Sequence, residues 1–244
     1  MSGPAPARRE EHLLLAYPRR DIAVTAVTVV LTAAIFAAVA SQGVLAHIQH
    51  VDNAWLHLMT SNRSGPVTAL AKFLDLLGLV YVTLPVRIAI AGYLALRRRW
   101  WHLAAFVVAI ALSEALIGTL KGIYDRARPP GSLVATSGAS FPSGHSIAAT
   151  VTVVAAVIAL VPPGRRRAWW GAGALVFSAL MALSRAYLAA HWLSDAIAGV
   201  LLGTSCALLA ALVVGALQRR RRGHQPDPAA HGPAPDVIQP ADQR

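Results

Sequence analysis

The chain has 244 residues, of which 56% are hydrophobic and only 14% are charged, and its mean hydropathy is +0.53. A soluble domain carries about 25% charged residues, so this composition excludes an ordinary soluble protein and indicates a polytopic membrane protein. The net charge of +11 is concentrated in short clusters between apolar runs, which favours membrane topology over nucleic-acid binding as its explanation.

Six apolar runs are long enough to cross a bilayer, which requires roughly 20 residues. They occupy residues 22–46, 76–96, 101–120, 144–161, 169–187 and 193–217. We therefore predict an all-α bundle of six transmembrane helices over residues 22–217. The first run is longer than the usual ~7–15-residue core of a signal peptide, so we expect an uncleaved anchor although residues 38–40 fit a cleavage site.

The segment 47–64, between the first two spans, has apolar residues at helical spacing and contains Trp55. This pattern predicts an amphipathic helix that lies on the membrane surface. The segment also contains His47, His50 and His57, which are conceivable metal ligands. Because no carboxylate–histidine ligand pattern accompanies them, we favour interfacial histidines.

The arginine clusters predict the orientation of the bundle. If the N-terminus is cytoplasmic, the clusters at 97–99, 165–167 and 219–222 all fall on the cytoplasmic side. The tail 1–21 and the segment 218–244 are then cytoplasmic too. The segment 218–244 begins with basic residues and continues with a stretch rich in proline and poor in large apolar residues, so we expect this later stretch to be disordered.

Two charged residues interrupt the predicted spans, Arg87 in the second and Glu114 in the third. An isolated charge within a bilayer is costly, so we expect these two side chains to pair across an antiparallel hairpin. We interpret the pair as structural rather than catalytic.

Three further segments carry polar residues at the predicted outer ends of spans. The first has Lys121 and, seven residues later, Arg128 followed by Pro129, in a stretch (121–140) that we expect to be a non-helical loop. If it were helical, Lys121 and Arg128 would share a face. Taken alone, the two cations could equally be anchors for lipid headgroups.

The second segment reads Phe-Pro-Ser-Gly-His at residues 141–145, where the fourth span begins. Ser143 and Gly144 at a helix start would leave backbone N–H groups free at the positive end of the helix dipole, which favours an anion. His145 follows and could reach the same anion. An ordinary helix cap is the alternative for this segment alone.

The third segment, residues 184–195, contains Arg185, His191 and Asp195 between two apolar runs. On a helix His191 and Asp195 would share a face, so that the carboxylate could orient the imidazole. An oriented neutral imidazole is a nucleophile or a base, and an arginine fork suits a phosphate. The alternative is a structural histidine at a helix end beside an arginine that reaches the membrane surface.

Together the three segments supply cations for phosphate oxygens and two histidines, one to attack phosphorus and one to protonate the leaving oxygen. A cationic site of this kind can act without a divalent metal. We therefore predict no metal and no cofactor.

The motifs Lys-x6-Arg-Pro, Pro-Ser-Gly-His and Ser-Arg-x5-His-x3-Asp, which this chain carries between Lys121 and Asp195, resemble those of the type 2 phosphatidic acid phosphatase superfamily. That family also includes the vanadium haloperoxidases. The resemblance implies that His191 is a nucleophile that forms a phosphohistidine, that Asp195 orients it, and that His145 is the general acid and then the base. It also implies a phosphate site without metal, formed by Lys121, Arg128, Ser143, Gly144 and Arg185.

We expect a multi-pass plasma-membrane phosphatase that acts on a lipid phosphate or diphosphate at the extracytoplasmic face. The substrates implied are undecaprenyl or other polyprenyl diphosphates, phosphatidic acid and phosphatidylglycerol phosphate. The Ala- and Arg-rich composition is typical of GC-rich bacterial genomes and favours the first. A transporter or flippase would require paired broken helices, a non-catalytic scaffold would lack motif residues, and a vanadate-dependent peroxidase is expected to be soluble.

Overall fold

The computed structural model describes residues 13–15 and 18–223, and within them it contains eight helices and no strand. The helices are α1 (Pro18–Ala40), α2 (Gln42–Ser61), α3 (Gly65–Gly78), α4 (Val80–Leu96), α5 (Trp100–Tyr124), α6 (Gly144–Leu160), α7 (Arg165–Tyr187) and α8 (Leu193–Gly223). The predicted disordered tail beyond residue 223 and most of the N-terminal tail lie outside the described residues.

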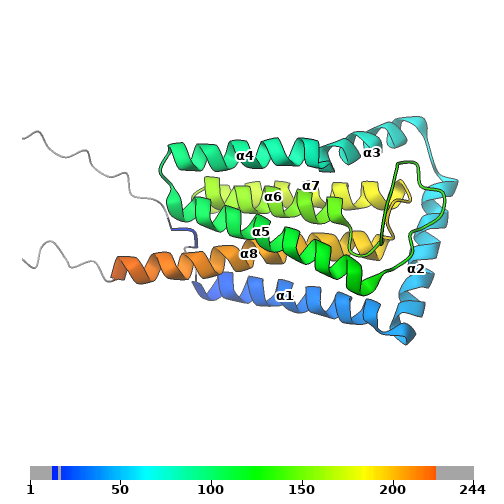
Figure 1. Cartoon of the computed structure of the whole chain (residues 1–244), viewed down its shortest axis with the longest axis horizontal. Coiled ribbons are helices and arrows are strands. Elements are labelled where there is room, and N and C mark those ends of the chain that lie inside the picture. Colours follow the sequence, from blue (N-terminus) through cyan, green and yellow to red (C-terminus); the bar gives the residue numbers. More distant parts are fainter. Residues whose placement is uncertain (1–12, 16–17, 224–244) are drawn as a thin grey trace, which may run out of the picture.

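Six columns of helix run along the long axis of the molecule, and α2 crosses one end of them (Figure 1). The columns are α1, the consecutive helices α3 and α4, and each of α5 to α8, which correspond in order to the six predicted spans. The helices α1, α5 and α8 are each long and apolar enough to cross a membrane, and the pair α3–α4, bent by 52°, is a fourth candidate. The all-α membrane bundle is thus confirmed.

Several predicted boundaries were wrong by a turn or more. Helix α5 continues to Tyr124, so Lys121 lies on a helix rather than in the loop, and the non-helical stretch is 125–143. Helix α8 continues to Gly223 instead of ending at residue 217, because arginine is a good helix former and hydropathy alone marks only where apolar residues stop. The second column begins at Gly65, eleven residues before the predicted start at 76.

Helix α2 bears out the prediction of an amphipathic helix between the first two spans. Its exposed apolar residues follow a seven-residue spacing at Val44, Val51 and Leu58. The side chains of His47, His50 and His57 are also exposed. Within residues 13–15 and 18–223, no group of three or more His, Cys, Asp or Glu side chains is arranged to hold a metal ion.

Two glycines of α8 let this helix touch the backbone of α6. A Cβ atom at Gly199 would lie 2.8 Å from the carbonyl oxygen of Ser143, and one at Gly203 would lie 2.9 Å from that of Ile147. Small residues at helix interfaces permit such close backbone approach within membranes. The start of α6 is therefore fixed against the first turns of α8.

Arg87 and Glu114 form the predicted ion pair, with Arg87 Nη1 2.7 Å from Glu114 Oε1. Arg87 also donates to the Thr152 hydroxyl (2.9 Å) and to the Ala148 carbonyl oxygen (3.3 Å) on α6. The Arg87 side chain is 11% exposed, whereas that of Glu114 is 52% exposed. Arg87 thus joins α4 to both α5 and α6.

We expect Arg87→Met to lower the free energy of unfolding by about 1–3 kcal/mol, because it removes donors from two partly buried acceptors on α6 as well as the ion pair. Glu114→Gln should cost less than about 1 kcal/mol, since the exposed amide oxygen can still accept the bond. Thermal unfolding of the detergent-solubilised variants measures both changes. Equal losses would show that the bonds from Arg87 to α6 contribute nothing.

Candidate active site

All the predicted site residues lie at the end of the bundle that α2 crosses (Figure 1). They come from the last turns of α5 and α7, the loops that follow these helices, and the first turns of α6 and α8. In chain order they are Lys121, Arg128, Ser143, Gly144, His145, Arg185, His191 and Asp195. The arginine clusters 97–99, 165–167 and 219–222 belong to the opposite ends of the same helices.

His191 and Asp195 do not share a helix face, contrary to the prediction. Helix α7 ends at Tyr187 and α8 begins at Leu193, so His191 lies in the turn between them, where Ala189 has a left-handed backbone (φ 54°). The Asp195 carboxylate accepts a bond from the backbone N–H of Trp192 (2.9 Å) and so caps the start of α8. Helical spacing therefore does not describe how these two residues are related.

The carboxylate of Asp195 reaches His191 through Ser140. His191 Nδ1 is 3.8 Å from Asp195 Oδ2 but 2.7 Å from the carbonyl oxygen of Ser140. The hydroxyl of the same serine donates to Asp195 Oδ2. A carbonyl oxygen can only accept, so we assign the proton to Nδ1, which leaves the lone pair of His191 on Nε2. This is the tautomer that a nucleophilic Nε2 requires.

His191 is almost completely buried, with 3% of its surface exposed. Burial lowers the pKa of His191 to about 4, and this effect outweighs the opposite influence of the nearby Asp195 carboxylate. The imidazole is therefore neutral at pH 7, as an attacking nitrogen must be.

Sequence reasoning missed Arg126, which binds the other oxygen of Asp195. Arg126 Nη1 lies 2.6 Å from Asp195 Oδ1, and the side chains are only 7% and 0% exposed. A buried carboxylate needs an ionic or hydrogen-bonding partner, and this requirement could have indicated a nearby cation.

Arg128 and Lys121 bind main-chain oxygens of the loop 125–143, and Arg128 also binds one of the turn between α7 and α8. The Arg128 guanidinium donates to the carbonyl oxygens of Ser137 (2.7 Å), Gly138 (2.9 Å), Ala139 (3.2 Å) and Ala190 (2.7 Å). Lys121 Nζ donates to Ala139 (3.1 Å). Arg128 Nη1 also lies 3.3 Å from His191 Nε2. One of the predicted phosphate-binding cations thus touches the predicted nucleophile.

Arg185 and His145 meet at a carboxylate that we had not predicted, that of Asp75 in α3. Asp75 Oδ1 forms an ion pair with Arg185 and lies 3.4 Å from His145 Nε2. Helix α3 packs closely here, since a Cβ atom at Gly78 would lie 2.5 Å from the ring of His145. Asp75 was missed because the predicted second span began one residue after it; a single acidic residue beside an apolar run was the available signal.

The start of α6 offers fewer free donors than predicted. The backbone N–H of Ser143 donates to the carbonyl oxygen of Asp195 (3.2 Å), and the Ser143 hydroxyl accepts a bond from Ser146 (3.0 Å). Gly144 is the first residue of the helix, so its N–H has no acceptor within the helix. The N–H groups of Gly144, His145 and Ser146, which have no acceptor within the helix, and the hydroxyl proton of Ser143 remain for an anion.

These contacts bring both histidines to the same cations. Arg128 touches His191 and, like Lys121, is close enough to His145 to interact with it electrostatically. The backbone carbonyl of Arg185 accepts a bond from the N–H of His191 (3.3 Å), while its side chain shares Asp75 with His145. The two imidazoles and the three predicted cations therefore belong to one connected set of contacts.

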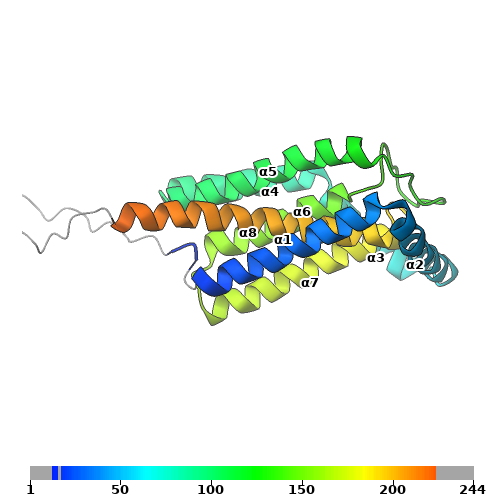
Figure 2. The same ribbon diagram turned by 90° about the horizontal axis from the view of Figure 1, so that it is seen from below.

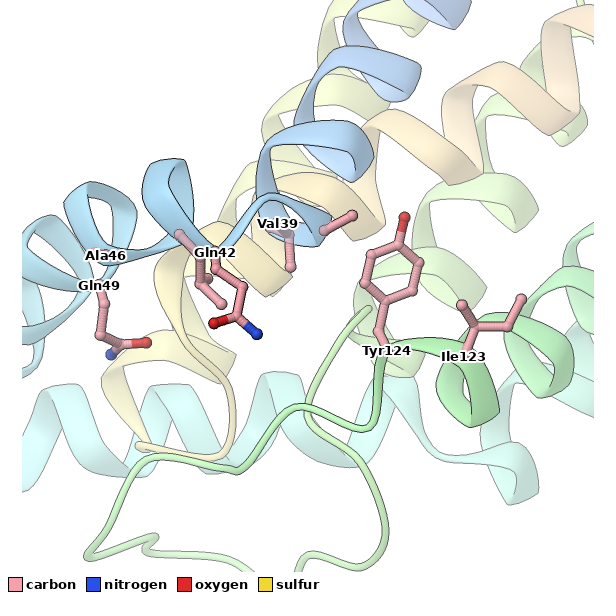
Figure 3. A pocket seen from close by; sticks show the side chains of 8 residues that line it. Val39, Gln42, Ala46, Gln49, Ile123 and Tyr124 are labelled. Carbon is pink, nitrogen blue, oxygen red and sulfur yellow. The ribbon is translucent and has the colours of Figure 1, made fainter.

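A cleft of about 640 Å³ opens between the corner of α1 and α2 and the end of α5 (Figure 3). Ile123 and Tyr124 line it from α5, and Gln49 lines it from α2. None of the predicted site residues lines it.

The family model of the PAP2 superfamily matches residues 102–219, which include all three motifs. The fold is similar to the crystal structure of the first transmembrane PAP2 type phosphatidylglycerolphosphate phosphatase from Bacillus subtilis, with a TM-score of 0.68 and 24% identity over 82% of this chain and 98% of that one. It is also similar to that of Aquifex aeolicus LpxE, with a TM-score of 0.53 and 22% identity over 64% of this chain and 91% of that one. No curated protein matches the sequence significantly.

The low pKa of His191 makes stability depend on pH. Its folded pKa of about 4 is below the unfolded value of 6.5, so the unfolded chain binds more protons between these values. The contribution of His191 should be complete above pH 6.5 and should fall by up to about 3 kcal/mol as pH drops to 4. We expect His191→Gln to show a weaker loss of melting temperature than the wild type between pH 7.5 and 4.5. If the melting temperatures of the two proteins fell equally with pH, the low pKa of His191 would be contradicted.

Proposed function

Because the family model of the PAP2 superfamily matches residues 102–219, we propose that the chain is an integral membrane phosphatase that hydrolyses a lipid phosphate or diphosphate through a phosphohistidine intermediate. The observation that carries the proposal is the state of His191. Its Nδ1 proton is held by the Ser140 carbonyl, and its Nε2 lone pair lies beside Arg128. A buried, neutral and oriented imidazole next to cations is suited to attack an anionic phosphorus centre.

In the first step, His191 Nε2 attacks phosphorus, and a nitrogen–phosphorus bond forms as the bond to the leaving oxygen breaks. His145 gives its proton to that oxygen. In the second step, His145 takes a proton from a water molecule, which attacks the phosphohistidine and releases inorganic phosphate. Both histidines return to their starting states.

The non-bridging oxygens of the phosphate would be held by Lys121, Arg128, Arg185 and the donors at the start of α6. The cationic side chains offset the charge of the transferring group, so we propose that no metal ion is required. Asp195, acting through Ser140, keeps the proton on Nδ1 of His191. Asp75 pairs with Nη1 of Arg185, so an entering phosphate would have to share this guanidinium with the carboxylate or displace it.

We place the site at the extracytoplasmic face of the plasma membrane. The support is the position of the arginine clusters 97–99, 165–167 and 219–222, at the end of the bundle opposite to the site. The substrate classes are polyprenyl diphosphates, phosphatidic acid and phosphatidylglycerol phosphate; the last is named for the similar Bacillus subtilis protein. A transporter is less well supported, because the described residues contain one bent helix pair and transporter repeats contain two.

We expect His191→Ala to abolish phosphate release from a panel of detergent-solubilised lipid phosphates, by at least about 1,000-fold, while the protein remains folded. His57→Ala, which removes an exposed histidine of α2, is the matched control and should retain activity. His145→Ala should also be slow. Near-normal turnover by His191→Ala would overturn the assignment of the nucleophile, and loss of wild-type activity in EDTA would overturn metal independence.

Asp75 lies where it would repel a phosphate, so we expect Asp75→Asn to tighten inhibition by vanadate several-fold. Vanadate should compete with substrate, since its trigonal-bipyramidal form resembles the transition state of phosphoryl transfer. Inhibition constants for the wild type and the variant test this. Weaker inhibition of Asp75→Asn would instead indicate that Asp75 mainly holds Arg185 in place.

A further inference from the structure

Helix α2 has one feature that its amphipathic pattern does not explain, the buried carboxylate of Asp52. Only 2% of this residue is exposed, although α2 lies across the end of the bundle and most of its residues are exposed. The apolar residues Leu45 and Ile48 already pack α2 against the core. Burial of a carboxylate is costly, and α2 does not need Asp52 in order to pack against the core. The burial of Asp52 therefore requires another explanation.

Asp52 accepts two hydrogen bonds from Ser194 at the start of α8. Its Oδ1 accepts the backbone N–H of Ser194 (2.9 Å), and its Oδ2 accepts the hydroxyl of the same serine (2.6 Å). Ser194 is the second residue of α8, so its N–H is one of those left without a partner inside the helix. Asp52 therefore caps α8 from a different helix and fixes the point at which the turn containing His191 ends.

Asp52 also shares a buried arginine with Asp195. Arg126 Nη2 lies 2.8 Å from Asp52 Oδ2, while Nη1 lies 2.6 Å from Asp195 Oδ1. Gln49, one turn before Asp52, accepts a further bond from Nη2 (2.7 Å). With both ends of its fork occupied, the guanidinium is held in one orientation, and so is the oxygen of Asp195 that it binds.

The chain of contacts continues from Asp195 through Ser140 to His191 Nδ1. We propose that Asp52 is a positioning residue for the nucleophile and that it acts through Arg126, Asp195 and Ser140. This inference rests on the proposed function, since it presupposes that His191 attacks phosphorus. Asp52 contacts none of the predicted phosphate-binding residues, so it affects the orientation of His191 and leaves the affinity for phosphate unchanged.

The test is Asp52→Asn, which keeps the size of the side chain and removes its charge. Activity is measured with dioctanoyl phosphatidic acid in detergent micelles, and turnover is expressed per vanadate-binding site, so that unfolded protein is not counted. We expect kcat per site to fall between about 10- and 100-fold, because a small misplacement of a reacting group has an effect of this size. KM and vanadate affinity should change less than about twofold, as expected when only transition-state interactions are lost.

Asp125→Asn is the matched control, since it removes the same charge from an exposed residue next to Arg126. It should leave kcat per site unchanged. A purely structural role for Asp52 would reduce the number of vanadate-binding sites without changing the turnover of each. That result, or a KM that rises while kcat is kept, would overturn the proposal.

A second pair of variants tests the path itself and applies even if Asp52→Asn folds poorly. Ser194→Ala removes one bond to Asp52, and Ser140→Ala removes the link between Asp195 and His191. If both act on the position of His191, their combined effect on kcat should be smaller than the product of the single effects. Multiplicative effects, or no effect of Ser194→Ala, would overturn the proposal. A wild type without activity would instead count against the proposed function.

Discussion

The carboxylate of Asp195 is the interaction on which the site depends. It is fully buried and is bound by Arg126, by the hydroxyl of Ser140 and by the backbone N–H of Trp192. These three partners come from the loop after α5, from the end of the same loop, and from the turn before α8. One charge thus joins segments that are far apart in the sequence, and because a buried charge without partners is very unfavourable, the three segments cannot separate independently.

Three cations of the site, Arg126, Arg128 and Lys121, differ in what binds them. Arg126 is held between two carboxylates, which neutralise its charge, so it positions Asp195 and does not bind an anion. Arg128 and Lys121 are held by carbonyl oxygens, which fix their positions without cancelling their charge. This difference explains why a strongly positive site can be rigid and still attract an anion. The basic residues of the sequence look alike, and only their partners distinguish them.

The sequence was sufficient to predict the bundle and the segments that meet at its end, because hydropathy indicates the spans and each of the three motifs lies within a short stretch of sequence. It was not sufficient to predict how His191 and Asp195 interact. A spacing of four residues implies a shared face only if both residues lie on the same helix. Here α7 ends at Tyr187 and α8 begins at Leu193, so His191 lies in the turn between the helices and Asp195 lies on α8. Asp75 and Asp52 were missed for a related reason, since a carboxylate shows its importance through burial and partners, which belong to the fold and not to local pattern.

The bend between α3 and α4 has a consequence for the second histidine. If residues 65–96 formed one straight helix, α3 would simply extend the axis of α4. The bend of 52° gives α3 a different direction, and Gly78, at the end of α3, packs against the ring of His145. Asp75 lies one turn before Gly78, so the same bend sets its distance to Arg185 and His145.

The two histidines are therefore supported from different sides. His191 depends on α2 and α8 through Asp52 and Asp195, whereas His145 depends on α3 through Asp75. The two histidines are thus held by separate contacts. A phosphate that bound Arg185 would meet Asp75 beside His145, whereas Asp52, Arg126 and Asp195, which support His191, are not among the groups predicted to bind phosphate.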